Sequence, residues 1–247
     1  MNAIRVERLD GVGLITIDRP ERRNALSLTM LAEMADAAEH LAAGCSAVVL
    51  AGAGGLFSAG VDLEELGRGV EDVEVDQALE RAVSRLSRLP VPTVAAIEGA
   101  CVGGAVEVAL ALDARVMARG AFFSVPAVSL GILYRPAALA RLSARLGPSA
   151  AARLMLFADR LGPETSAALG LVTDLCDEGE ARERALTLAR SVPNLTGEAV
   201  KATKRVLLEV AEGRGEEVEW ERVRHALLVS EERAAALARA RRPRGER

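Results

Sequence analysis

The chain has 247 residues, a formal net charge of −4 and 50% hydrophobic residues, which is enough for one large domain with a sizeable apolar core. The mild acidity, with one Trp and one Tyr, argues against a nucleic-acid-binding protein, which needs basic patches and aromatic stacking platforms. Three widely spaced cysteines, an N-terminus without a signal-peptide pattern and the lack of a long apolar run together predict a cytoplasmic protein with no metal site and no membrane partner.

The first part of the chain predicts a hairpin followed by helices and a buried strand. Residues 4–18 alternate between apolar and polar types on both sides of Asp10-Gly11, a favoured tight-turn pair. Residues 27–43 carry apolar side chains at helical spacing, and Ser27 is placed as the N-cap. The other elements expected here are a loop at 19–26, a buried strand at 46–52, a glycine-rich turn running into a helix at 52–66, an acidic, mobile loop at 67–76 and a helix at 77–89.

The same pattern of strand, glycine turn and helix then repeats. It predicts a buried strand at 93–100, a glycine turn at 101–104, a helix at 105–113 and a strand at 114–118. Two such units in succession predict an α/β domain whose glycine turns share one edge. From residue 136 the chain is almost all helical, with a short strand at 171–176, and two helices with a basic tail follow residue 195. We expect a core domain at 1–190 and a C-terminal helical region at 191–247.

The two glycine turns have the features of an anion site. The first turn of a helix carries unsatisfied N–H groups and a partial positive charge, and glycine lets a ligand approach that backbone closely. One such turn is common for packing reasons alone. Two turns on one edge can direct two N–H groups at one oxygen, which predicts an oxyanion hole for a carbonyl that becomes negative in the transition state.

Glu107 is a carboxylate in an otherwise apolar helix. It lies three residues after Gly104, so the two residues share one helix face about a turn apart. From there the carboxylate could reach the atoms beside a carbonyl held by the Gly104 N–H group. It could equally pair with a structural arginine, such as Arg115 or Arg141, because a buried carboxylate is costly without a partner. The spacing alone leaves both interpretations open.

Three segments resemble, in order and spacing, the signature regions of the crotonase (enoyl-CoA hydratase/isomerase) superfamily. They are ITIDRPERRNALS at 15–27, VVLAGAGGLFSAGVDL at 48–63 and AAIEGACVGGAVEVALALDARVMA at 95–118. The resemblance implies an α/β fold, a crotonase-like spiral of strand-strand-helix units with a C-terminal helical trimerisation region. It also implies a homotrimer or a dimer of trimers, an acyl-CoA thioester as the molecule bound, and no cofactor, because coenzyme A is part of the substrate.

The resemblance also assigns roles to individual residues. Two backbone N–H groups of the family stabilise a thioester enolate, and on this sequence they belong to Val61 and Gly104. The first of the family's two catalytic glutamates falls on Glu107. The substrate-binding positions implied in the same way are Arg22, Arg23, Ala25, Ser58, Ala59, Gly60, Asp62, Leu63, Gly103 and Ala127. The two arginines are expected to contact the CoA phosphates.

The sequence departs from the family pattern where the second catalytic glutamate should stand. That position is Ala127, and the glycine-rich run that normally follows is replaced by YRPAA at 134–138. Alanine cannot exchange a proton, and general acid–base catalysis contributes roughly 10²- to 10⁴-fold in rate. The first interpretation is a carbon–oxygen lyase of fatty acid metabolism that hydrates a 2-enoyl-CoA with Glu107.

Two alternatives remain open. One is a different enolate reaction of a CoA thioester, such as isomerisation, decarboxylation or hydrolysis, in which Tyr134 or Ser129 supplies a polar group. The other is a non-catalytic acyl-CoA-binding homologue that keeps the pocket without the chemistry. Glu107 favours an enzyme, because a binding protein has no need of a costly carboxylate beside the enolate carbon.

Overall fold

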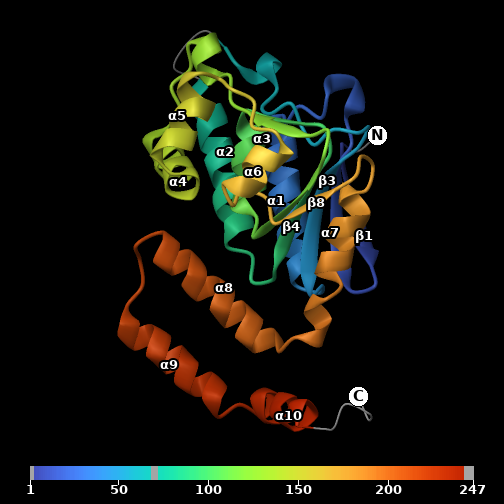
Figure 1. Ribbon diagram of the computed structural model, residues 1–247, viewed down its shortest axis with the longest axis vertical. Helices are drawn as coiled ribbons and strands as arrows, with labels where there is room; N and C mark the ends of the chain where they lie inside the picture. The colour runs from blue at the N-terminus through green and yellow to red at the C-terminus, as the bar shows by residue number, and fades with distance from the viewer. Residues whose placement is uncertain (1–2, 68–71, 242–247) are drawn as a thin grey trace.

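The core of the protein is a six-stranded sheet with the strand order β1-β2-β3-β4-β6-β8, in which only β1 and β2 are antiparallel (Figure 1). The computed structural model describes residues 3–67 and 72–241. Two further strands, β5 and β7, form a small parallel sheet. The strands are β1 (Ile4–Leu9), β2 (Val12–Ile17), β3 (Ala47–Gly52), β4 (Thr93–Ile97), β5 (Ala100–Val102), β6 (Ala114–Ala118), β7 (Phe122–Ser124) and β8 (Asp174–Cys176).

Helices cover the main sheet, and the predicted hairpin and first helix are confirmed. β1 and β2 pair up to Leu9 and Val12, on either side of Asp10-Gly11, and Ser27 accepts a hydrogen bond from the Met30 N–H group at 3.2 Å. β2 and β4 are buried along their whole length, so both sheet faces are covered, and α1 and α7 pack against them. The helices are α1 (Leu28–Ala42), α2 (Asp72–Ser87), α3 (Gly104–Ala111), α4 (Pro136–Leu146), α5 (Pro148–Leu156), α6 (Pro163–Ala168), α7 (Ala181–Ala189), α8 (Gly197–Ala211), α9 (Glu217–Leu228) and α10 (Glu231–Ala240).

Two predictions between residues 52 and 76 are wrong. The first glycine turn leads into a single 3-10 turn, Leu63–Glu65, and not into an α-helix. The acidic loop is helical from Asp72 onward, because Asp72 and Glu74 occupy the first turn of α2, where negative charge complements the helix dipole. Residues 68–71 of that predicted loop lie outside the described residues.

The small second sheet and the end of the chain also differ from expectation. Residues 101–102, predicted as part of a turn, belong to β5, and no strand was expected at β7. Three helices follow residue 195, where two were predicted. The short strand predicted at 171–176 is confirmed as β8.

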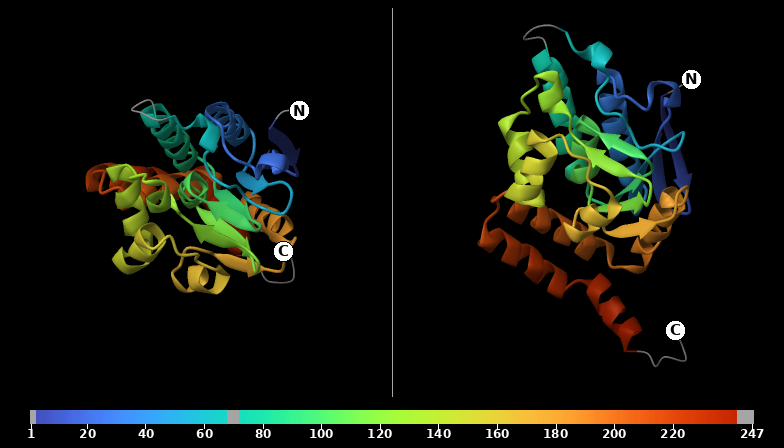
Figure 2. Two further views of the ribbon diagram at one scale, coloured as in Figure 1. Left: turned by 90° about the horizontal axis from the view of Figure 1, so that it is seen from above. Right: turned by 45° about the horizontal axis from the view of Figure 1, so that its top comes forward.

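Helices α8, α9 and α10, residues 197–240, form a C-terminal arm that extends away from the core (Figures 1 and 2). None of the three helices has a buried residue, and Leu207, Val218 and Val229 are 66%, 80% and 85% exposed. Lys204 fastens the arm to the core, since its Nζ donates hydrogen bonds of 2.7 Å to the Val91 carbonyl and to Asp113 Oδ2. In the described part of the chain, no helix has both the length and the apolarity to cross a bilayer.

Candidate active site

The first glycine turn is held in place by buried polar side chains. The Asn24 amide donates to the carbonyls of Ala53 at 2.8 Å and Leu56 at 3.1 Å. The Ser58 hydroxyl donates to the Asn24 carbonyl at 2.7 Å and accepts from the Gly60 N–H group at 3.0 Å. Asn24 and Ser58 are both 0% exposed. These bonds fix the backbone that leads into Val61.

The two glycine turns are in contact with one another. Gly60 has a φ of +94°, and a Cβ atom there would lie 2.5 Å from the Val102 carbonyl oxygen and 3.2 Å from the Gly104 nitrogen, so only glycine fits. A Cβ on Gly104 would lie 3.0 Å from Val61 Cγ2. The expectation that the two turns share one edge is therefore confirmed.

Two N–H groups at this contact have no hydrogen-bond acceptor among the described residues. The parallel bridge between Leu26 and Val61 uses the Gly60 carbonyl and the Asp62 N–H group, so the Val61 N–H points away from Leu26. Gly104 is the first residue of α3, where an N–H group has no partner within the helix. Among the described residues, neither N–H group donates a backbone hydrogen bond. Both are available to a ligand oxygen.

Helix α3 carries Glu107 into the interior. All eight residues of this helix are buried, and the Glu107 side chain is 5% exposed. Arg115 is buried at the other end of the helix, where its Nη1 donates to the Leu112 carbonyl at 2.7 Å and its Nε donates to the Leu171 carbonyl. These bonds fix the C-terminal end of α3. They occupy Arg115, and neither of them is made with Glu107.

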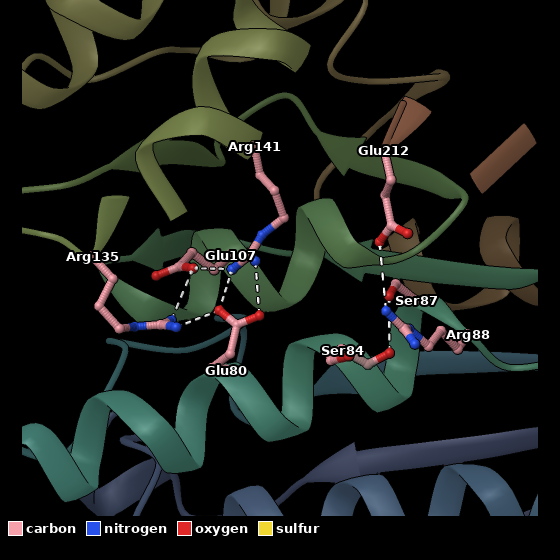
Figure 3. Close-up of polar contacts among 8 residues, drawn as sticks. All are labelled: Glu80, Ser84, Ser87, Arg88, Glu107, Arg135, Arg141 and Glu212. Carbon is pink, nitrogen blue, oxygen red and sulfur yellow. Dashed lines mark hydrogen bonds and ion pairs between the residues drawn. The ribbon is translucent and has the colours of Figure 1, made fainter. Parts of the chain in front are cut away.

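Glu107 belongs to a cluster of two carboxylates and two guanidinium groups (Figure 3). Its Oε2 lies 3.1 Å from Arg141 Nη2 and 3.7 Å from Arg135 Nη2. Glu80, on α2, binds both arginines and accepts two hydrogen bonds of 2.8 Å from Arg141. We call these four residues the Arg–Glu cluster. The ion pair of Glu107 with Arg141 was one of the two interpretations left open by the sequence.

The two carboxylates of the cluster differ in their acidity. Burial raises the pKa of Glu107 above the ordinary value of 4.5, and the attraction of Arg135 and Arg141 only partly opposes this. Hydrogen bonds from Arg141 and then Arg135 lower the pKa of Glu80. Glu107 is therefore the better suited of the two to exchange a proton, while Glu80 stays ionised and holds the arginines.

Tyr134 lies close to the same site. Its hydroxyl oxygen is 3.8 Å from the position that a Cβ on Gly103 would occupy. Burial, and then the charge of Glu107, raise the pKa of Tyr134. The phenol therefore keeps its proton and is available as a hydrogen-bond donor beside the second glycine turn.

A cavity of about 980 Å³ begins at Glu107 and continues between the core and α8. Its wall is largely apolar, with Val83, Leu110 and Leu142 among the lining residues. Glu80 and Arg141 also line it, so the Arg–Glu cluster stands where the cavity meets α3. Val61 and Gly104 are not among its lining residues, so the cavity approaches the glycine turns through Glu107, which lies one helical turn from Gly104.

Comparison with known proteins agrees with this geometry. The family model described as enoyl-CoA hydratase/isomerase matches residues 7–231. The chain belongs to the enoyl-CoA hydratase/isomerase family. It is therefore an enzyme of this family, and an acyl-CoA thioester fits as its substrate.

Individual members of the family show how far the likeness extends. The probable mitochondrial enoyl-CoA hydratase 2 of Arabidopsis thaliana is 33% identical over 92% of this chain and 78% of that protein. The human mitochondrial Delta(3,5)-Delta(2,4)-dienoyl-CoA isomerase is 30% identical over 78% of this chain and 64% of its own length. The crystal structure of an enoyl-CoA hydratase/carnithine racemase from Magnetospirillum magneticum has a TM-score of 0.91, with 27% identity and 98% and 94% of the two chains covered. The predicted crotonase fold with a helical C-terminal region is confirmed.

In this enoyl-CoA hydratase/isomerase family member, the predicted phosphate-binding arginines differ in their surroundings. Arg22 is half-exposed and bound to Glu64. Arg23 is exposed, has a φ of +53°, and its side chain makes no ion pair within the described residues. Arg23 is therefore the more available of the two for an anion.

The other predicted substrate positions lie around the two turns. Asp62 is occupied, since its carboxylate accepts from Arg19 at 2.6 Å and from the Glu64 N–H group at 3.1 Å. Ser58 is also fully hydrogen-bonded, as described above, while Leu63 is 61% exposed. Ala25 and Ala59 are partly buried neighbours on the two loops, and Gly103 caps α3 with a φ of +59°. Ala127 is buried at 5% exposure and packs in the core.

The sequence did not assign Glu80 or Arg135 to the site. In the sequence, Glu80 is one polar position of a predicted helix. Arg135 belongs to the run YRPAA, which departs from the family pattern, and no role was assigned to it. The unusual run YRPAA was therefore the available signal.

In residues 3–67 and 72–241, no group of three or more His, Cys, Asp or Glu side chains is placed to hold a metal ion.

The raised pKa of Glu107 predicts how stability depends on pH. The native state holds this proton to a higher pH than the unfolded chain, so its contribution to stability is present below about pH 4.5 and is lost as pH rises through the native pKa. Glu107→Gln removes the titration. The difference in melting temperature, variant minus wild type, should therefore be larger at pH 8 than at pH 4.5. Differential scanning fluorimetry at the two pH values measures this difference. A constant or shrinking difference would contradict the prediction.

Proposed function

We propose that the enzyme hydrates a 2-enoyl-CoA, with the thioester oxygen bound by the N–H groups of Val61 and Gly104 and with Glu107 as the acid–base residue. The observation that carries the proposal is the contact of two glycine turns with unpartnered N–H groups, one helical turn from a buried carboxylate whose pKa is raised. Two N–H groups at one oxygen stabilise the negative charge that develops there. No cofactor is proposed, because coenzyme A is carried by the substrate.

In the proposed reaction one carboxylate serves both proton transfers. Glu107 accepts a proton from water as the water oxygen bonds to C3 and the electron pair of the C2–C3 double bond moves into the thioester, forming the enolate. The enolate is held at Val61 and Gly104. Protonated Glu107 then returns the proton to C2, so that one water molecule is added in total. Arg141 holds the carboxylate in place by its 3.1 Å contact.

Ala127 favours a second candidate function. A hydratase of the two-glutamate kind loses part of its proton transfer when one glutamate is absent. A different enolate reaction, such as isomerisation, decarboxylation or thioester hydrolysis, would use the same oxygen site with Glu107 alone, and the Tyr134 hydroxyl beside Gly103 is a ready donor.

We also propose that the protein assembles as a homotrimer or as a dimer of trimers in the cytoplasm. The C-terminal arm supports the assembly, because its three helices bury no residue in one protomer and the arm exposes Leu207, Val218 and Val229. Cys45, Cys101 and Cys176 are free thiols, which supports a reducing compartment.

Crotonyl-CoA tests these functions in one titration with two readouts. The loss of enoyl-thioester absorbance reports hydration, and calorimetry reports binding. Turnover in the wild type that disappears in Glu107→Gln is the expected result. Binding without turnover would overturn the hydratase proposal for this substrate and favour the other enolate reactions, which malonyl- and 3-enoyl-thioesters would then test. Absence of binding would overturn the acyl-CoA site itself.

A further inference from the structure

We propose that the acyl group of the substrate carries a carboxylate and that Arg141 and Arg145 bind it. The inference deepens the proposed function and rests on it, because it needs an acyl-CoA whose carbonyl lies at Val61 and Gly104. Both arginines line the cavity of about 980 Å³ that begins at Glu107.

The charges of the cavity favour an anionic ligand. Its lining holds four carboxylates and four cations, and Arg135, which binds Glu80 and lies 3.7 Å from Glu107, adds a fifth cation. Two of the carboxylates pair with cations that do not belong to α4: Asp113 with Lys204 at 2.7 Å, and Glu212 with Arg88 at 3.9 Å. Glu80 and Glu107 pair with Arg135 and Arg141. Arg145 is attracted only by Asp113, which Lys204 already pairs, so one positive charge of the five is in excess.

Arg145 lines the cavity as an exposed side chain that, within the described residues, forms no hydrogen bond and no ion pair. It stands four residues after Arg141, so the two guanidinium groups share one face of α4, an arrangement that is unfavourable for like charges. The Nη2 atom of Arg135 is also buried without a hydrogen-bond acceptor. A carboxylate at Arg141 and Arg145 would relieve the repulsion and supply the missing negative charge.

The path from the thioester leads to this pair. Glu107 lies one helical turn from Gly104, Arg141 Nη2 lies 3.1 Å from Glu107 Oε2, and Arg145 follows one turn along α4. Leu110 and Leu142 line the same cavity and suit the methylene groups of a chain. The site therefore fits a short acyl chain with an apolar middle and a charged end.

The test compares saturated thioesters that cannot be hydrated, so that it measures binding alone. Calorimetry with glutaryl-CoA and pentanoyl-CoA, and with adipyl-CoA and hexanoyl-CoA, compares chains of equal length with and without the carboxylate. We expect at least one carboxylated thioester to bind about 10-fold more tightly than its uncharged partner, as charge-assisted bonds to arginine allow. Arg145→Met should reduce this preference to about 3-fold or less and leave pentanoyl-CoA binding unchanged.

Two further variants complete the test. Arg141→Met should also remove the preference, and circular dichroism shows whether this variant folds. If it does not fold, Arg145→Met decides the matter, because the Arg145 side chain has no hydrogen bond or ion pair to lose among the described residues. Arg153→Met is the matched control, since Arg153 lies on α5, pairs with Asp159 and does not line the cavity. Equal binding of charged and uncharged thioesters, or a preference that survives in Arg145→Met, would overturn the inference while the acyl-CoA site stands. Failure of every thioester to bind would overturn the proposed function and this inference with it.

Discussion

Replacement of Glu107 by glutamine should lower the kcat for crotonyl-CoA hydration by roughly 10²- to 10⁴-fold, the usual worth of general acid–base catalysis. The variant keeps the shape of the side chain and an oxygen that accepts from Arg141, so the dissociation constant for an acyl-CoA should change only a few-fold. The substitution removes the proton exchange together with one negative charge of the Arg–Glu cluster. Stopped-flow absorbance with saturating crotonyl-CoA measures the rate, and calorimetry with a saturated thioester measures the binding.

The matched control is Glu80→Gln, which changes the other carboxylate bound to the same two arginines. Hydrogen bonds from Arg141 and Arg135 lower the pKa of Glu80, so this group does not exchange a proton near neutral pH. Its replacement should lower kcat by less than about 10-fold. Equal losses in the two variants would show that the charge balance of the Arg–Glu cluster matters and that Glu107 has no separate role in proton transfer.

Replacement of Gly60 by alanine should abolish most of the activity and destabilise the fold. The new Cβ would lie 2.5 Å from the Val102 carbonyl oxygen and 3.2 Å from the Gly104 nitrogen, at a φ of +94°. The two turns must then separate, which misaligns the Val61 and Gly104 N–H groups and should cost about 10²- to 10³-fold in kcat. The strained backbone and the close contact should lower the free energy of unfolding by about 2 kcal/mol or more, as urea denaturation measures.

Gly55→Ala separates the contact from the backbone strain. Gly55 has a similar φ of +74°, but a Cβ there meets nothing within 4 Å. This variant should lose about 1 kcal/mol of stability and keep wild-type turnover. If Gly55→Ala lost activity as Gly60→Ala does, or if Gly60→Ala remained fully active, the close approach of the two turns would have no part in the reaction.

Local patterns predicted the parts of the fold that local forces decide. Asp10-Gly11 fixes a hairpin because both residues adopt positive φ, and Ser27 begins α1 because its hydroxyl satisfies an N–H group of the first turn. The meeting of the glycine turns was also predictable, since β3 and β4, which precede them, are parallel neighbours in one sheet, although the short β5 stands between β4 and the second turn. The helix after Asp72 was missed because an acidic run is typical of loops as well as of the first turn of a helix.

The Arg–Glu cluster could not be read from the sequence. Glu80 and Arg135 are 55 residues apart and come from α2 and the loop before α4, so only the tertiary packing brings them together. The sequence offered Arg141 and Arg115 equally as partners for Glu107. The structure distinguishes them, because Arg115 is buried and donates its hydrogen bonds to carbonyls at the end of α3. Periodicity reports which face of a helix is buried but not what faces it.

Asp113 connects the segment that follows α3 to the C-terminal arm. Its Oδ2 accepts hydrogen bonds from the Thr93 N–H group and hydroxyl at 2.7 and 2.8 Å, and it also holds Lys204 of α8 at 2.7 Å. This carboxylate follows directly on the helix that presents Glu107. A force that pulls on α8 therefore acts on the foot of α3. A substitution at Asp113 would therefore loosen the attachment of the arm and the start of β4 at the same time.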